Sequence, residues 1–260
     1  MRGGFTSGAV RGLKGMKTST HDGILVLADI SGFTAFVTTT ELEHGPQIIA
    51  ALLETVMQRL SPPLDIQEVE GDAVFAVGPD PALAPPRRLL DVFDQAFVAF
   101  KALQRELAAD ASCSCGACRS VPSLDLKIVA HHGRFLRQQV GGHGQVAGAD
   151  VILTHRLLKN GVTDRRAYLL LTEAMLEWLG LDASRSGLDA RVESYEHLGD
   201  VRCFVRDFPA VGEARGARGG HRGLSRLTGP RWRARARARR ARPPAPPTRA
   251  SAAAGTRPTG

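Results

Sequence analysis

A short apolar run near the N-terminus constrains the fold more than any other segment. Gly23-Ile24-Leu25-Val26-Leu27-Ala28 contains no polar side chain and ends at Asp29. A continuous run of this length is typical of a strand that is buried on both faces. The turn residues Ser31 and Gly32 follow and predict that a helix begins at once. We therefore expect a central strand whose two faces are both covered.

The hydrophobic periods predict that helices alternate with strands between His21 and Phe208. Apolar residues spaced by three and four predict long helices over 46–60 and 86–108, and Pro62-Pro63 ends the first of them. Further expected elements are helices over 149–159 and 173–179, a hairpin over 64–78 with its turn at Gly71-Asp72, strands over 124–130 and 135–140 joined at Gly133, a strand over 167–171, and a closing hairpin over 192–204. This order predicts an α/β (α+β) fold in which helices pack on a mostly antiparallel sheet.

The positive charge of the chain is concentrated at its C-terminal end. Residues 212–260 contain 13 Arg, no Lys and one acid, Glu213, so this segment carries a charge of +12. The net charge of the whole chain is +8, so the other residues together carry −4. Low-complexity Arg, Pro and Ala sequence with few apolar residues predicts a disordered tail over 209–260. Two interpretations stay open. The tail is an arm that binds nucleic acid or an anionic surface, or it is a solvated extension of little consequence.

The two ends of the chain flank one predicted folded domain over 21–208. Residues 1–20 are expected to form a disordered N-terminal extension, and Met16 is an alternative start. The chain has no apolar stretch near the roughly 18 residues that a membrane span needs, and its first residues lack the apolar run of a secretory signal. We expect a cytoplasmic protein without a membrane span.

Two carboxylates occupy positions that suit a metal site. Asp29 ends the apolar strand, and Asp72 lies in the turn of the predicted hairpin beside Gly71. If the fold places that turn next to the first strand, the pair would offer oxygen ligands to Mg²⁺ or Mn²⁺. The Ser31-Gly32-Phe33-Thr34 segment would present backbone N–H groups at a helix start, where phosphate binds readily. Either acid alone is more often a cap or a turn residue.

Several motifs together resemble the catalytic domain of the class III adenylate and guanylate cyclases. The resemblance rests on Ala28-Asp29-Ile30-Ser31-Gly32-Phe33-Thr34, Glu70-Gly71-Asp72-Ala73-Val74-Phe75-Ala76, Leu126-Lys127-Ile128-Val129-Ala130-His131-His132-Gly133 and Gly148-Ala149-Asp150-Val151-Ile152-Leu153-Thr154-His155-Arg156-Leu157. It covers about residues 22–206 in the family's order. It implies a ferredoxin-like cyclase fold, a head-to-tail homodimer and active sites shared between the two subunits.

The resemblance also assigns site residues. The two-metal site of the family would fall on Asp29 and Asp72 with the Ile30 carbonyl, the triphosphate loop on Gly32, Phe33 and Thr34, and the transition-state arginine on Arg156. The implied ligands are a nucleoside triphosphate and two Mg²⁺ or Mn²⁺ ions. Such metals would lower the pKa of a ribose 3′-hydroxyl, and Arg156 of the partner subunit would stabilise the charge on the phosphorane.

Other catalytic positions depart from the family pattern. Glu68 stands where the family has a base-reading Lys, Gln145 at its adenine-reading Asp or Thr, and Ile152 at its ribose-orienting Asn. The closing hairpin reads His197-Leu198-Gly199-Asp200 in place of a Lys-Gly motif. Loss of one group that acts in the transition state costs on the order of 10²- to 10³-fold in rate. The sequence thus leaves two functions open: a divergent nucleotidyl cyclase, or a catalytically degenerate dimer that binds a nucleotide or a partner protein.

Three of the four cysteines form a C-x-C-x₂-C segment, Cys113 to Cys118, within the predicted loop 111–121. The thiolates of Cys113, Cys115 and Cys118 suit Zn²⁺ at about 2.3 Å per Zn–S bond. The fourth ligand would come from Cys203, a histidine, a partner chain or water. The alternative is three free or redox-active thiols, since an intracellular location disfavours a disulfide.

Overall fold

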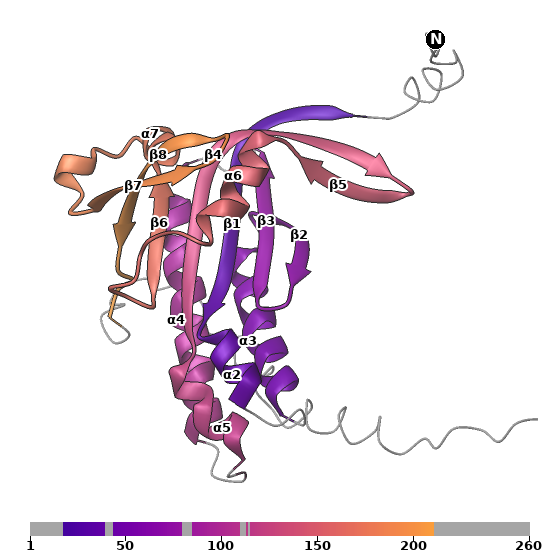
Figure 1. Ribbon diagram of the computed structural model, residues 1–260, viewed down its shortest axis with the longest axis vertical. Helices are drawn as coiled ribbons and strands as arrows, with labels where there is room; N and C mark the ends of the chain where they lie inside the picture. Colours follow the sequence, from indigo (N-terminus) through magenta and orange to yellow (C-terminus); the bar gives the residue numbers. More distant parts are fainter. Residues whose placement is uncertain (1–17, 40–43, 80–84, 110–112, 114, 211–260) are drawn as a thin grey trace, which may run out of the picture. The chain divides into compact units, whose positions relative to one another are not determined.

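The computed structural model describes residues 18–39, 44–79, 85–109, 113 and 115–210 (Figure 1). The predicted C-terminal tail, apart from its first two residues, and most of the predicted N-terminal extension lie outside these ranges. In the described part, one eight-stranded sheet has the strand order β2-β3-β1-β4-β6-β8-β7, with β5 paired to β4. The β4–β6 pair is parallel and the other pairs are antiparallel, which confirms the predicted mostly antiparallel sheet.

Most elements follow the predicted order, but the helix Gly116–Ser120 and the strand His143–Ala147 were not predicted. The strands are β1 (Ser19–Ser31), β2 (Asp65–Glu70), β3 (Ala73–Pro79), β4 (Asp125–Val140), β5 (His143–Ala147), β6 (Tyr168–Thr172), β7 (Asp189–Tyr195) and β8 (Gly199–Arg206). The helices are α2 (Phe33–Thr39), α3 (Gly45–Leu60), α4 (Arg88–Ala109), α5 (Gly116–Ser120), α6 (Ala149–Leu157) and α7 (Glu173–Leu179), with short 3₁₀ turns η3 (Val121–Ser123) and η4 (Ala183–Arg185).

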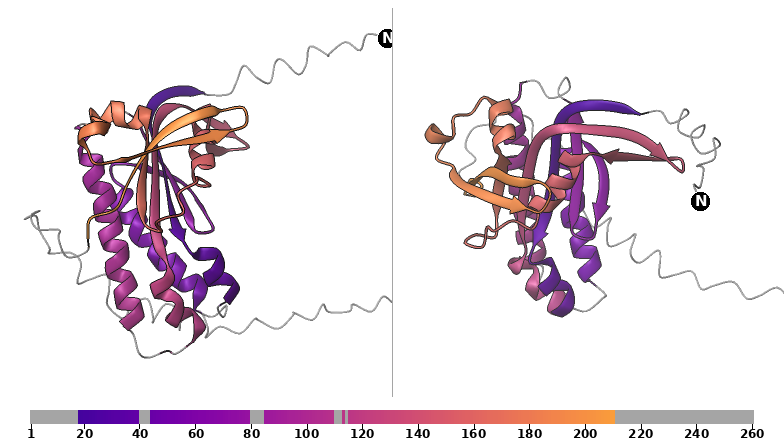
Figure 2. Two further views of the ribbon diagram at one scale, coloured as in Figure 1. Left: turned by 60° about the vertical axis from the view of Figure 1, so that its left-hand side comes forward. Right: turned by 45° about the horizontal axis from the view of Figure 1, so that its top comes forward.

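Both faces of β1 are covered, as its apolar run predicts. Ile24 and Val26 pack into the main core together with residues of α3 and α4, whereas Leu25 and Leu27 point to the opposite face and share a smaller cluster with Val151 of α6. Figures 1 and 2 show α3 and α4 on one face of the sheet and α6 on the other. The strand is therefore sandwiched between two layers of helices, and its polar end at Asp29 emerges on the α6 side.

The predicted break at Gly133 is wrong. β4 runs without interruption from Asp125 to Val140, and Gly133 pairs with Gly23 inside the β1–β4 ladder. A Cβ atom at Gly133 would lie 2.5 Å from Oδ2 of Asp150, so the glycine allows α6 to approach the strand closely and makes no turn. The chain reverses only at Gly141 and Gly142, whose positive φ angles lead into β5, a strand that we did not predict.

The hairpin between β2 and β3 has the predicted turn. Glu70 pairs with Ala73, which leaves Gly71 and Asp72 as the two turn residues, and Gly71 adopts a φ of 59°. A bulge between Ile66 and Glu68 shifts the register of the preceding strand.

In the part of the chain that the structure describes, no helix combines the length and apolar character that crossing a membrane requires.

Candidate functional site

The fold brings Asp29 and Asp72 together, as the sequence suggested. β1 and β3 are neighbours, with Asp29 opposite Ala73, so the turn residue Asp72 lies beside the end of β1. The backbone N–H of Ile30 donates a hydrogen bond of 3.1 Å to the carbonyl of Asp72 and fixes the turn there. The side chain of Ile30 points the other way, into the main core.

Asp72 is held in an unfavourable electrostatic environment. Burial is the main cause that raises the pKa of its carboxyl to about 6, and the negative charge of Asp29 and a side-chain hydrogen bond with that residue contribute to the same rise. The positive charge of Lys127 acts in the opposite direction. A divalent cation between the two carboxylates would relieve the penalty that these effects place on the charged form.

Lys127 is a site residue that the sequence analysis did not single out. Its ammonium lies 3.0 Å from Oδ2 of Asp29 and donates a further hydrogen bond of 3.1 Å to the carbonyl of Leu158. The side chains of Lys127 and Asp29 are 19% and 14% exposed, so water screens this ion pair only partly. The available signal was a single charged residue in the otherwise apolar run Leu126–Ala130.

Asp29 and Asp72 line a cavity of about 190 Å³ beside the β2–β3 turn. Its lining comprises Leu27, Asp29, Glu68, Glu70, Asp72, Ala73, Phe75, His155 and Leu158. Four of these residues are acids, and Glu68 and Glu70 are exposed at the rim. A bare polyphosphate would be repelled from this cavity, whereas hard divalent cations would be attracted to it.

The predicted phosphate loop begins directly after β1. Gly32 has a φ of 89°, and a Cβ atom there would lie 2.6 Å from a terminal guanidinium nitrogen of Arg166. The carbonyl oxygen of Ser123 would lie 3.0 Å from the same Cβ atom. The loop therefore has room only for glycine, and it has an exposed guanidinium against its backbone. No sequence signal marked Arg166, because it comes from a distant loop before β6.

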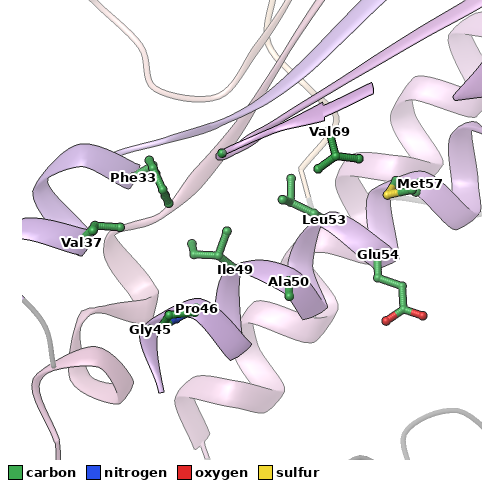
Figure 3. Close-up of a pocket in the computed structure, with 11 residues that line it drawn as sticks. Phe33, Val37, Gly45, Pro46, Ile49, Ala50, Leu53, Glu54, Met57 and Val69 are labelled. Carbon is green, nitrogen blue, oxygen red and sulfur yellow. The ribbon is translucent and has the colours of Figure 1, made fainter. Parts of the chain in front are cut away.

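A second, larger cavity is lined by residues of α2, α3 and the β2–β3 hairpin (Figure 3). It has a volume of about 460 Å³, and its lining is Phe33, Val37, Gly45, Pro46, Ile49, Ala50, Leu53, Glu54, Met57, Val69 and Gly71. Glu54 is the one charged residue among these, so the lining suits an apolar group rather than a phosphate or a metal ion. The larger volume would favour this cavity as the binding site. The carboxylates that line the smaller cavity make that one the better candidate for binding metal ions.

The remaining residues assigned by the resemblance lie apart from the acidic cavity. Arg156 and Ile152 are one helical turn apart on an exposed face of α6, where Ile152 is 55% exposed. Gln145 is exposed on β5. None of the three belongs to the lining of the acidic cavity in this subunit.

The adjacent histidines on β4 have structural contacts. His131 is buried, its Nδ1 lies 2.8 Å from the hydroxyl of Thr172, and its Nε2 lies 3.5 Å from Asp150. Burial lowers the pKa of His131. His132 stacks on Trp178. Successive side chains of a strand point to opposite faces of the sheet, and both histidines are held there by packing contacts. These contacts favour a structural role for the two histidines over a catalytic one.

The three cysteines of the C-x-C-x₂-C segment gather around a histidine. The Sγ atoms of Cys113, Cys115 and Cys118 lie 3.4, 3.4 and 3.7 Å from Nδ1 of His44. All four ligand atoms lie within 4.8 Å of one another. Cys203 is buried in a separate cluster on β8 and is therefore not the fourth member. No sequence-local spacing pointed to His44, which precedes the cysteines by more than sixty residues.

Two sequence comparisons find relatives of this chain. Residues 49–168 match the family model described as "Protein of unknown function (DUF2652)". The "Uncharacterized protein Rv2561/Rv2562" of Mycobacterium tuberculosis is 32% identical over 159 residues, which are 61% of this chain and 73% of that protein.

Solved structures of similar fold include a guanylyl cyclase and an adenylyl cyclase. The guanylyl cyclase Cya2 superposes with a TM-score of 0.56 at 16% identity, covering 76% of this chain and 96% of that one. The adenylyl cyclase CyaB from P. aeruginosa gives 0.52 at 15% identity, covering 75% and 98%. The chain therefore has a cyclase-like fold, which confirms the predicted fold class.

Proposed function

The chain belongs to the same family as the uncharacterized protein Rv2561/Rv2562 of Mycobacterium tuberculosis, and we propose that it is a divergent class III nucleotidyl cyclase-like protein. It binds a nucleoside triphosphate through divalent cations held by Asp29 and Asp72 and converts it to a cyclic nucleotide. The observation that carries this proposal is the pairing of two carboxylates at the end of β1, in an acidic cavity, on a cyclase-like fold.

The charges of the cavity explain why cations are required. Asp29, Glu68, Glu70 and Asp72 oppose a triphosphate, and Lys127 offsets only one of these charges. The residues fit Mg²⁺ or Mn²⁺, because carboxylates and a backbone carbonyl such as that of Ile30 are the oxygen ligands that these ions take. When bound, the ions would neutralise the phosphates and lower the pKa of the ribose 3′-hydroxyl.

Arg166 extends the site toward the phosphate loop. Its guanidinium lies against Gly32, at the place where the resemblance locates the triphosphate. The closing hairpin, where the cyclase family carries a phosphate-binding Lys, has His197 and Leu198 instead. We assign to Arg166 the task of binding the phosphates at this loop, because a guanidinium can contact two phosphate oxygens at once.

A homodimer would complete the site. Arg156 is exposed on α6 and does not line the acidic cavity of its own subunit. In the head-to-tail arrangement that the resemblance implies, it would enter the cavity of the partner and stabilise charge on the reacting phosphate. Its position is consistent with such a shared site.

A second function is favoured by Glu68. This acid lines the cavity at the position of the base-reading Lys, and Gln145 and Ile152 replace two further groups of the cyclase site. A chain that kept the metal-binding carboxylates but lost these contacts would bind nucleotide without turning it over. It would then act as a signalling module that responds to nucleotide or to a partner protein.

One experiment separates the two functions. The purified chain is incubated with Mn²⁺ and ATP or GTP, products are analysed by mass spectrometry, and melting temperatures are recorded in parallel. Cyclic product that is absent from an Asp29→Ala control establishes the cyclase. A rise in melting temperature without product establishes the binding module. No response to either nucleotide would contradict the cyclase and nucleotide binding, and would leave only the binding of a partner protein.

Mixing of variants tests the shared site. Asp29→Ala and Arg156→Ala chains are each expected to be inactive, whereas an equimolar mixture that exchanges subunits should recover roughly a quarter of the activity through one intact site per mixed dimer. An inactive mixture whose subunits demonstrably exchange would show that Arg156 does not act across a dimer.

A further inference from the structure

We propose that His44, Cys113, Cys115 and Cys118 form a structural zinc site that joins two distant connections of the fold. The proposal is independent of the nucleotide site, because none of these residues lines the acidic cavity. His44 precedes α3, and the three cysteines lie between α4 and the 3₁₀ turn that leads into β4. The sequence suggested the cysteines as ligands, and the structure supplies the fourth.

The distances have the size that a zinc tetrahedron requires. With Zn–S bonds of about 2.3 Å and a Zn–N bond of about 2.0–2.1 Å, tetrahedral angles place sulfur and nitrogen about 3.6 Å apart. The three Sγ–Nδ1 distances are 3.4, 3.4 and 3.7 Å. The three sulfur atoms thus already lie at nearly the distance from Nδ1 of His44 that ligands around one ion would have, and all four atoms lie within 4.8 Å of one another.

Hydrogen bonding alone does not account for this arrangement. A ring nitrogen of histidine offers either one proton or one lone pair. Nδ1 of His44 can therefore make one good hydrogen bond, yet three sulfur atoms converge on it at nearly equal distances. A metal ion at the centre of the cluster satisfies all four atoms at once. The cysteines are not joined as disulfides.

The backbone around the cysteines is folded to support thiolates. The N–H of Cys115 donates to the sulfur of Cys113 at 3.5 Å, and the N–H of Cys118 donates to the sulfur of Cys115 at 3.4 Å. The second of these bonds also caps the start of α5. Hydrogen bonds of this kind orient metal ligands and stabilise their charge.

The position of the cluster explains what the ion would hold. α2, which begins in the predicted phosphate loop, packs against α5, and the two helices lie at the same end of the sheet as the start of α3 (Figures 1 and 2). The segment after α5 continues into η3, where the carbonyl of Ser123 lies against Gly32. A zinc ion would fasten this end of the molecule, where α5 has only five residues.

Four protein ligands leave no open position for a substrate. Catalytic zinc sites keep one position for water or substrate, whereas structural sites are closed by four side chains. We therefore assign the ion a role in stability, in which it joins the start of α3 to the segment around α5. Because the ligand set contains three thiolates, zinc is favoured over Mg²⁺ or Mn²⁺, which prefer oxygen ligands.

The test is metal analysis of the full chain, purified without a histidine tag and without chelator. About one zinc per chain is expected. Replacement by Co²⁺ should produce the visible absorption bands of a tetrahedral thiolate site. His44→Ala and Cys115→Ser should each weaken zinc binding at least tenfold in competition with a chromophoric chelator.

Control variants separate loss of a ligand from loss of the fold. His44→Cys should retain zinc and shift the Co²⁺ spectrum toward that of four thiolates, which a merely unfolded chain would not do. Cys203→Ala and Asp29→Ala should retain zinc, since both residues lie outside the cluster. Wild-type chain that binds neither Zn²⁺ nor Co²⁺, or a His44→Ala variant with unchanged zinc affinity, would overturn the proposal.

Discussion

The Lys127 ammonium lies 3.0 Å from the carboxylate of Asp29, its direct partner in the β1–β4 ladder. The candidate metal site thus contains a cation of its own, placed by the register of two central strands. Any divalent ion that binds Asp29 must share this carboxylate with Lys127 or displace it. Lys127 therefore adjusts the affinity of the site for metal, and the first prediction follows from this competition.

Lys127→Met should destabilise the chain without divalent ions and increase its response to them. Removal of the ammonium leaves Asp29 and Asp72 unbalanced in a half-buried site, which should cost on the order of 1–3 kcal/mol of unfolding free energy. Added Mn²⁺ should then raise the melting temperature of the variant more than that of the wild type. Lys101→Met, which breaks the similarly exposed pair with Asp125, is the control and should leave the Mn²⁺ response unchanged.

Asp72→Asn should stabilise the chain at high pH and not at low pH. The pKa of Asp72 is about 6 in the folded chain, against an ordinary value of 3.8 for an aspartate carboxyl. The folded state therefore holds its proton more tightly, and it loses stability as the pH rises from 4 to 6. Chemical denaturation in buffer free of Mg²⁺ and Mn²⁺ should show a more stable variant at pH 8 and equal stabilities near pH 4.

The control for Asp72→Asn is Glu106→Gln, which removes an exposed charge from α4. It should not reproduce the difference between the two pH values. Equal effects of the two substitutions at pH 8 would show that the environment of Asp72 is not the cause.

Glu68→Lys should strengthen nucleotide binding. The change removes one negative charge from the lining of the acidic cavity and adds a positive one, where attraction to a phosphate or a purine edge replaces repulsion. Titration with ATP or GTP in the presence of Mn²⁺ should show roughly tenfold tighter binding. Glu106→Lys makes the same charge change on α4 and should have little effect. Equal gains in nucleotide affinity in both variants would show that the change in net charge alone is responsible.

Arg166→Ala should weaken nucleotide binding without changing metal binding. Its guanidinium lies against Gly32 but does not line the cavity that contains Asp29 and Asp72. Loss of one charge-assisted phosphate contact should weaken triphosphate affinity about tenfold, measured by calorimetry with a non-hydrolysable analogue. Arg185→Ala, at an exposed position near η4, is the control. An unchanged affinity would exclude Arg166 from the site.

Gly133→Ala should destabilise the fold, although alanine is tolerated in strands. Its Cβ atom would collide with Asp150, whose Oδ2 accepts a hydrogen bond of 2.6 Å from the backbone N–H of Arg134. Displacement of α6 should cost about 1–3 kcal/mol in denaturant titrations. Gly144→Ala on β5 meets nothing closer than 3.5 Å and should change stability by less than about 0.5 kcal/mol. Similar losses in both variants would show that general strand propensity is responsible.

Local periodicity was sufficient for most elements and failed where glycine had a tertiary role. The apolar stripes predicted α3 and α4 well, because one buried face imposes its own spacing. Gly133 resembled a turn residue in the sequence, but the packing of α6 against β4 requires a glycine at that point of the strand. The turn that exists, at Gly141 and Gly142, has the same residue type and could be distinguished only by its pairing.

The sequence by itself determined most helices and strands and placed Asp29 at a strand end and Asp72 in a turn, because burial patterns and turn chemistry are local properties. The cyclase-like fold was expected from the resemblance of several motifs to a known family. Only the tertiary structure decided which distant groups lie together. Lys127 meets Asp29 through strand register, Arg166 reaches Gly32 from a loop before β6, and His44, at the start of α3, meets three cysteines in and around α5. Such contacts depend on the three-dimensional path of the chain, which no spacing along the sequence encodes.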